Sequence, residues 1–373
     1  MASTAKTHNV ISFLQALKKA SKDLQNNPIS IRSRKDPKVA IEALLELATN
    51  ADTILSSNPN LSDITQSLTN LKELLEDLER IQGYGLHSLV SYVITKKKIS
   101  KTGYEMEAKL QSHIDRESAV DLVQILTKSK DENEKVEALA RFDNRLAQGF
   151  DWDYQELILR GKIFTIIESI LCGSTCSDRL NDQAARAVIS LVKFNRVVFL
   201  GMVLMGSIIQ SLISTASSIN VRVLYSLIRC AKTHLIEELQ YNREISRIIN
   251  LLNSEDPSVA EAALLCLFEI AFYGSKEVIE AMVGEELVQK LMELQRRKQR
   301  TGFCKSRVEN QEEVMTEEFA FEDCVWRFAV QIQVGEGLQK KEKHAFKLTI
   351  LEIVRRASVF EDCQIDILWG SSP

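Results

Sequence analysis

The sequence predicts an all-α protein in which an N-terminal helical bundle is followed by an α-solenoid. Three observations support this fold class. Only five prolines occur and 6% of the residues are aromatic, whereas unbranched side chains, which lose little rotamer freedom in a helix, are abundant. A chain of 373 residues is too long for one compact core. An apolar pattern also recurs about every 40 residues between Val120 and Leu294, a period typical of stacked helical repeats.

Residues 1–110 lack this repeat and are predicted to form a bundle of four helices. The first helix is indicated by apolar residues at helical spacing between Val10 and Leu17. The second begins at Asp36-Pro37, where the carboxylate can cap free N–H groups and proline costs no hydrogen bond. The third, from Leu61 to Ile81, has apolar residues alternately three and four apart, like a coiled-coil seam. Gly83-Tyr84-Gly85 is expected to end it.

The fourth helix is expected to hold Leu86 to Val93 and to end in the basic run Lys96–Lys101. Lysines at the C-terminal end of a helix complement the negative end of its dipole. Nuclear import or lipid binding is the alternative interpretation of this run. The bundle is expected either to bind a partner or to cap the repeats.

Residues 111–300 are predicted to form the repeats. Each unit combines a short apolar helix with a second helix of small and large apolar residues, which stacking against the neighbouring unit would bury. The first helices are predicted at Val120–Leu126, Ile163–Ile167, Ile208–Leu212, Ile245–Leu252 and Leu287–Leu291. The second helices are predicted at Ala138–Phe142, Ala187–Leu191, Val223–Leu227 and Ala263–Leu267.

The stretch Val197–Ile213 has no charged residue. A membrane span needs about 20 apolar residues, so this stretch is short for one. Glycines at 201 and 206 interrupt it. Two buried helices joined by a glycine turn are therefore predicted here, with a membrane segment as the alternative.

The C-terminal part is predicted to contain an insertion and a cap. In residues 301–318 the tail of a basic block is followed by an acidic block with little apolar content, which indicates a charged flexible insertion. The alternative is that the whole charged stretch 296–318, which includes this insertion, is a regulatory or docking segment. Residues 319–373 are expected to form helices, broken at Gly335-Glu336-Gly337, that cap the solenoid.

Charge and cysteine content exclude several protein classes. A net charge of −4 gives no indication of a nucleic-acid platform. The seven cysteines are odd in number and scattered, which favours buried thiols in a reducing compartment over a disulfide framework. The first 25 residues have no secretory pattern and only a weak likeness to an organelle transit peptide. We expect a cytoplasmic or nuclear protein.

No group of residues has the spacing of a known catalytic or cofactor site. The five histidines form no HxxxH or HExxH pattern, and Cys172 and Cys176 have no second pair to complete a zinc site. Glycine-rich phosphate loops and GxSxG are also absent from the sequence. We therefore expect a protein that is not an enzyme and binds no metal or cofactor.

The second-helix pattern Ala-Leu-x-x-Leu resembles the inner helix of armadillo repeats, the family of importin α and β-catenin, from His113 to Arg300. The resemblance implies a right-handed armadillo solenoid. In that family an asparagine six residues past the alanine clamps the backbone of an extended peptide. The matching positions here are Asn144, Lys193, Arg229 and Glu269.

A tryptophan two residues past the alanine forms lysine pockets in importin α. Those positions here are Ala140, Ile189, Tyr225 and Leu265, so binding of a nuclear import signal is not implied.

The whole arrangement is similar to plant armadillo proteins related to the U-box ubiquitin ligases. The likeness is carried by Gln148-Gly149-Phe150, by Val330–Leu338 and by the closing Leu368–Pro373. The U-box itself has no place between the bundle and His113, so an E2-recruiting activity is not implied.

The function predicted is a non-enzymatic scaffold or adaptor that holds a peptide or helix of a protein partner, and neither nucleic acid nor a membrane is expected as the partner. The mixed charge of the groove predicts a partner with both signs, or a helical ligand. The alternatives are a substrate-recruiting component of a ubiquitin-ligase pathway and a membrane-associated bundle whose Lys96–Lys101 run meets anionic lipid. The predicted groove residues are Asn144, Arg186, Lys193, Arg222, Arg229 and Glu269.

Overall fold

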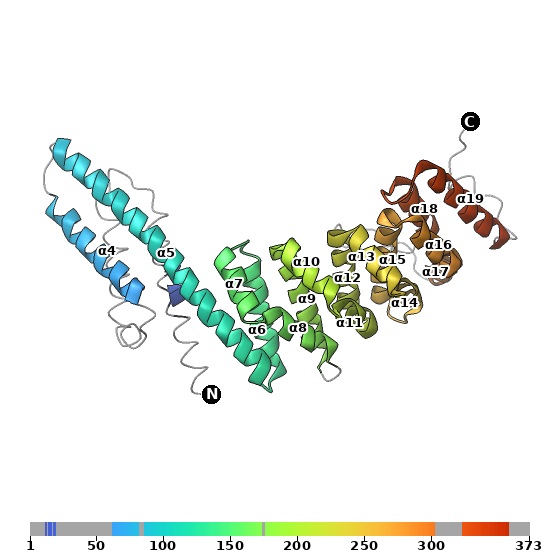
Figure 1. The fold of residues 1–373 in the computed structure, drawn as a ribbon, viewed down its shortest axis with the longest axis horizontal. Coiled ribbons are helices and arrows are strands. Elements are labelled where there is room, and N and C mark those ends of the chain that lie inside the picture. The colour runs from blue at the N-terminus through green and yellow to red at the C-terminus, as the bar shows by residue number, and fades with distance from the viewer. Residues whose placement is uncertain are drawn as a thin grey trace. The chain divides into compact units, whose positions relative to one another are not determined.

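The structure is a computed structural model, and all the secondary structure in its described residues is helical (Figure 1). The all-α prediction is therefore confirmed for this part of the chain. The described residues are 62–81, 86–173, 176–302 and 323–357, with parts of a helix between 12 and 19.

Contacts between elements divide the chain into two compact units. The first comprises residues 1–130 and 151–163, and the second comprises residues 131–150 and 164–373. Each unit is described in turn.

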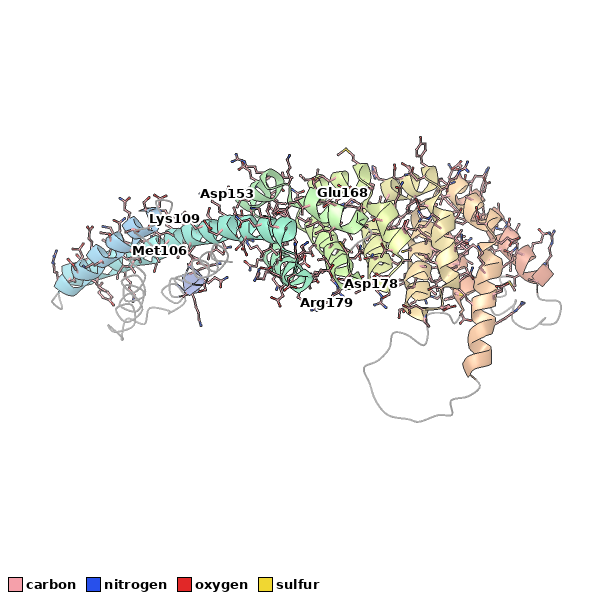
Figure 2. The ribbon with its side chains drawn as sticks, turned by 90° about the horizontal axis from the view of Figure 1, so that it is seen from below. Met106, Lys109, Asp153, Glu168, Asp178 and Arg179 are labelled. Carbon is pink, nitrogen blue, oxygen red and sulfur yellow. The ribbon has the colours of Figure 1, made fainter. Side chains whose placement is uncertain are left out.

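In the first unit, α4 (Ser62–Arg80) and α7 (Trp152–Arg160) both pack against α5 (Leu86–Lys128). Lys109 of α5 donates from Nζ to Oγ of Ser67 on α4 at 3.2 Å, and Figure 2 labels Lys109 and Met106 along α5. The buried apolar residues of this pair of helices include Ile64, Leu71, Met106 and Leu110. The third helix of the predicted bundle is thus confirmed as α4.

The predicted first helix is supported by the residues described there. Leu14 is fully buried, and Nζ of Lys18 donates to Oε1 of Gln111 on α5. The second predicted helix, beginning at Asp36-Pro37, and the break at Gly83-Tyr84-Gly85 lie outside the described residues.

The prediction that the fourth helix ends in the lysine run is wrong. Helix α5 is continuous over 43 residues, and Lys96–Lys101 lies within it. Lysine is a good helix former and therefore does not stop a helix, and buried apolar residues continue at Ile99 and Met106. Lys96 itself is only 4% exposed, so the run is not a uniform surface cluster. The same helix contains Val120–Leu126, which was predicted as the first helix of the repeats.

In the second unit, five helices form successive layers in chain order, each packed against the next (Figure 1). The first four contain the second helices predicted from the small-then-large apolar pattern, and the fifth contains the predicted C-terminal segment around Phe328. The layers are α6 (Glu132–Leu146), α9 (Asp178–Phe194), α12 (Ser218–Ala231), α15 (Pro257–Tyr273) and α18 (Cys324–Val334).

Two further sets of helices lie between the layer helices in the sequence. The predicted apolar helices are found in α8 (Ile163–Cys172), α11 (Ile208–Thr215), α14 (Glu244–Asn250), the 3-10 turn Leu251–Asn253 and α17 (Leu287–Gly302). A third set of short helices completes the repeats, and of these only the one in the stretch Val197–Ile213 was predicted, so two helices per repeat is an incomplete description. The short helices are α10 (Arg196–Met205), α13 (Thr233–Tyr241) and α16 (Lys276–Gly284).

A capping side chain marks the start of the first four layer helices, α6, α9, α12 and α15. Asp131 accepts from the backbone N–H of Asn133 at 2.9 Å, and Ser217 accepts from that of Asn220 at 3.1 Å. Asp256 caps α15 in the same way, with Pro257 at the first helical position. These caps satisfy N–H groups that have no partner within the helix.

The uncharged stretch Val197–Ile213 forms two helices, α10 and α11, with Gly206 between them. Phe199, Val203, Ile208 and Leu212 are fully buried, which confirms the prediction of two buried helices joined at a glycine. Among the described residues, no helix alone has the length and apolar character to cross a membrane. The α10–α11 pair meets those two criteria only together and is bent by 70°.

At the C-terminal end, α18 stops at Gly335, and α19 (Lys340–Ala357) packs against α17 and α18 and buries Phe346 and Ile350. The predicted break at Gly335-Glu336-Gly337 is confirmed. The backbone N–H groups of Glu336 and Gly337 both donate to the carbonyl of Phe272 on α15, at 2.7 and 3.2 Å. Residues 303–318 of the charged insertion and the closing Leu368–Pro373 lie outside the described residues.

Candidate partner-binding surface

Five of the six predicted groove residues are exposed. Asn144 lies on α6, Arg186 and Lys193 lie on α9, and Arg222 and Arg229 lie on α12. The two cations on each of these last helices are seven residues apart, a separation of nearly two turns that places them on one helix face. Glu269 on α15 is less accessible, with a side chain 22% exposed.

The structure brings the predicted residues of α12 and α15 together in ion pairs. Arg229 Nε lies 3.6 Å from Glu269 Oε1, and Arg222 Nη2 lies 3.5 Å from Oε2 of Glu261. The two arginine side chains are 61% and 54% exposed, whereas Glu269 and Glu261 are only 22% and 13% exposed. The carboxylates are therefore covered and the guanidinium groups face the solvent.

Tyr225 contributes an aromatic ring beside these charges. The Arg229 guanidinium lies 5.7 Å from the centre of the Tyr225 ring, a distance at which a cation–π attraction operates. Burial raises the pKa of Glu269, and this shift is opposed by the charge of Arg229 and by a hydrogen bond with the Tyr225 side chain. Arg229 is thus held by both an acid and an aromatic ring.

A covered acid also accompanies Arg186, between α6 and α9. Asp143 accepts a hydrogen bond from Nε2 of Gln183 at 2.7 Å. Burial raises the pKa of Asp143 to about 6, while the side chain of Ser190, the charge of Arg186 and the amide of Gln183 each lower it. Asp143 directly precedes the exposed Asn144 on α6.

Hydrogen bonds between layers hold this face in register. The Asn220 side chain donates to Oδ1 of Asn181 at 2.7 Å in the interior, and Ser217 donates from Oγ to Asp182 at 2.6 Å. Arg179, which lies at the start of α9 and is labelled in Figure 2, donates from Nη1 to Oδ1 of Asn133 on α6 at 3.1 Å. These contacts join α6 to α9 and α9 to α12, and α9 and α12 carry the exposed cations.

Aromatic contacts connect further layers. The Arg327 guanidinium of α18 lies 5.0 Å from the centre of the Phe268 ring on α15, and Nζ of Lys232 lies 5.1 Å from that of Tyr273. Positive charge held against a ring of a neighbouring layer therefore recurs along the stack.

Glu261 and Asp143 are not among the predicted groove residues, and Tyr225 was predicted only as a position that lacks tryptophan. A signal for Glu261 was present, because it lies 39 residues after Arg222, and Glu269 lies 40 residues after Arg229. Opposite charges offset by one repeat can meet on neighbouring layers. Asp143 has no comparable periodic signal.

Reactive chemistry is not brought together in the part of the chain that the structure describes. No group of three or more His, Cys, Asp or Glu residues there could hold a metal ion. The five cysteines of this part are free thiols. Burial raises the pKa of Cys266, and raises that of Cys324 to about 12, so these two thiols are poor nucleophiles.

Comparison with known proteins identifies no family. No family model matches the chain, and no curated protein is similar to it. Two crystal structures of engineered proteins from the Northeast Structural Genomics Consortium superpose with TM-scores of 0.43 and 0.45 at 16% and 13% sequence identity. The first covers 67% of this chain and 92% of its own, and the second covers 97% and 86%. Similarity at this level carries no functional inference.

Proposed function

We propose that this protein is a non-enzymatic scaffold that holds a segment of a protein partner on the exposed faces of α6, α9, α12 and α15. The observation that carries the proposal is the row of exposed cations on α9 and α12, three of which lie beside a covered acid, as Arg229 does beside Glu269. Binding surfaces made from repeated layers extend over several units, which suits an extended or helical ligand.

The fixed geometry of this row favours binding over simple solvation. Arg229 contacts both Glu269 and Tyr225, so less side-chain freedom is lost when it meets a ligand. Arginine and tyrosine are also the residue types that most often dominate binding energy at protein interfaces.

We further propose that the stack is an armadillo-type right-handed solenoid. Three helices per repeat and a period near 40 residues support this assignment, together with the alanine-leucine pattern of the layer helices. The likeness to plant armadillo proteins related to U-box ligases extends the proposal to an adaptor of that type that lacks an E2-binding domain.

Proximity labelling in native cells tests the scaffold function. The wild-type chain is compared with Lys193→Glu/Arg229→Glu, and Arg196→Glu serves as the control because Arg196 is an exposed cation on α10, which is not one of the layer helices. We expect the double variant to lose its main partners and the control to retain them. An unchanged set of partners in the double variant would show that this face is not the binding site. Copurifying ligase subunits would favour the ubiquitin-pathway role.

A further inference from the structure

We infer that the segment bound on this face is a carboxylate-rich peptide with acidic residues at three-residue intervals. The inference rests on the proposed function and specifies its ligand. It concerns four cations, Arg186, Lys193, Arg222 and Arg229, which we call the cation grid.

The outward charge of the grid is positive although the face contains both signs. In the two ion pairs that cross from α12 to α15, each arginine is more than half exposed, and each glutamate is less than a quarter exposed. Asp143, the acid beside Arg186, is likewise partly buried. A ligand in solution therefore meets guanidinium and ammonium groups before it meets carboxylates. The positive outward charge therefore differs from the prediction of a partner that carries charges of both signs.

The spacing of the grid fits one backbone conformation. Two residues seven apart on a helix are separated by about 10 Å along its axis, and neighbouring packed helices lie about 8–10 Å apart. In a polyproline II segment every third side chain points the same way and is about 9 Å from the last. Carboxylates three residues apart therefore match the grid along either direction.

Carboxylates spaced in this way fit better than the backbone of a nucleic acid. Glu261, Glu269 and Asp143 lie beneath the cations, and a phosphate on every nucleotide would bring negative charge over these acids as well as over the grid. The chain as a whole is also negative, with a net charge of −4. A peptide can leave neutral residues over the acids.

Fluorescence anisotropy with the purified full chain tests the inference. The probes are a labelled Gly/Ser peptide with glutamate at every third position, the same peptide with lysine instead, and a single-stranded RNA of equal length. We expect binding of the glutamate peptide that weakens as salt is added. Arg222→Glu/Arg229→Glu should weaken it by about tenfold or more, whereas Arg196→Glu should leave it unchanged.

A second variant protects the test against misfolding of the first. Glu261→Gln/Glu269→Gln removes the covered carboxylates and frees their arginines, so the glutamate peptide should bind tighter by about threefold. Circular dichroism checks that each variant is folded.

Several results of these binding experiments would overturn the inference. Preference for the lysine peptide or for RNA overturns the inference, and so does glutamate-peptide binding that neither double variant changes. Failure of the glutamate peptide to bind also overturns it. In that case the scaffold function stands if the labelled partners still depend on Lys193 and Arg229, and falls if they do not.

Discussion

The side-chain amide of Asn220 donates a hydrogen bond to Oδ1 of Asn181 at 2.7 Å, inside the interface between α12 and α9. Asn220 is fully buried and Asn181 is 6% exposed. Asn181 in turn donates to the carbonyl of Leu171 on α8 at 3.4 Å. A shift of α12 along α9 would leave these amides unpaired in an apolar interior, so the pair fixes the register of two layers.

Replacing one member of this pair should destabilise the second unit. Asn181→Leu leaves the Asn220 amide without its acceptor, and we expect a loss of about 1–3 kcal/mol in the free energy of unfolding, measured with urea. Asn181→Leu/Asn220→Leu should cost less than the sum of the two single changes. Asn144→Ala, at an exposed position, should change stability by less than about 0.5 kcal/mol. Strict additivity in the double variant would contradict a coupled pair.

The turn after α18 should tolerate no side chain at Gly337. A Cβ there would lie 2.1 Å from the backbone carbonyl oxygen of Gly274, which cannot move without shifting the end of α15. We expect Gly337→Ala to cost about 1–3 kcal/mol in thermal unfolding experiments. Gly201→Ala is the control, because Gly201 lies inside α10 and, apart from the backbone of its own helix and its chain neighbours, no atom lies within 4 Å of the added Cβ. That change should stabilise the protein by about 0.5–1 kcal/mol.

The stability of the second unit should fall as the pH rises through the titration of Asp143. The pKa of this carboxyl is raised in the folded chain from its ordinary 3.8 to about 6. The folded state therefore binds the proton more tightly, and this contribution is complete below pH 3.8 and lost by about pH 6.

Urea unfolding of the wild type and Asp143→Asn between pH 4 and pH 7 measures this effect. The difference between the two should grow in favour of Asp143→Asn up to about pH 6 and then level off. Ser190→Ala removes a hydrogen bond that lowers this pKa, and should move the upper limit of the window to higher pH. A pH-independent difference would show that the Asp143 carboxyl titrates normally.

Truncation of two residues of α10 should change stability by very different amounts. Phe199 is fully buried and its ring stacks on Phe164 with centroids 6.2 Å apart, whereas Val197 is 86% exposed. Phe199→Ala should cost about 3–5 kcal/mol in urea unfolding, and Val197→Ala should change stability by less than about 0.5 kcal/mol. Equal effects would mean that this apolar stretch does not have one face in the core.

Sequence periodicity predicted the layer helices because their burial is strongly patterned. Ala187 with Leu191, and Ala263 with Leu267, are fully buried, so the small and large residues needed for close helix packing are visible in the sequence. The nine-residue α13 has only Leu235, Ile236 and Leu239 buried, too few residues to define a period. The charged run predicts an end for the fourth helix, but lysine continues a helix readily and α5 extends to Lys128.

The exposed residues of the site could be predicted in part. Helical spacing placed Arg186 with Lys193, and Arg222 with Arg229, on common faces. The ion pairs between layers depend on how far one helix is shifted along the next. The sequence of a single helix does not determine that shift. The covering of Glu261 and Glu269, which gives the face its positive outward charge, therefore emerges only from the packed structure.

Each junction between successive layers is closed by a different polar or backbone contact. Asp143 meets Gln183 at the first and Asn220 meets Asn181 at the second. Arg229 meets Glu269 at the third, and the Gly337 turn meets the end of α15 at the fourth. Duplicating or exchanging one repeat would preserve the apolar interior. The polar contacts of that repeat would no longer match those of the repeats on either side. The order of the repeats is thus determined by the contacts at their junctions. Lengthening this protein by copying a unit would require new contact residues on both sides of the copy.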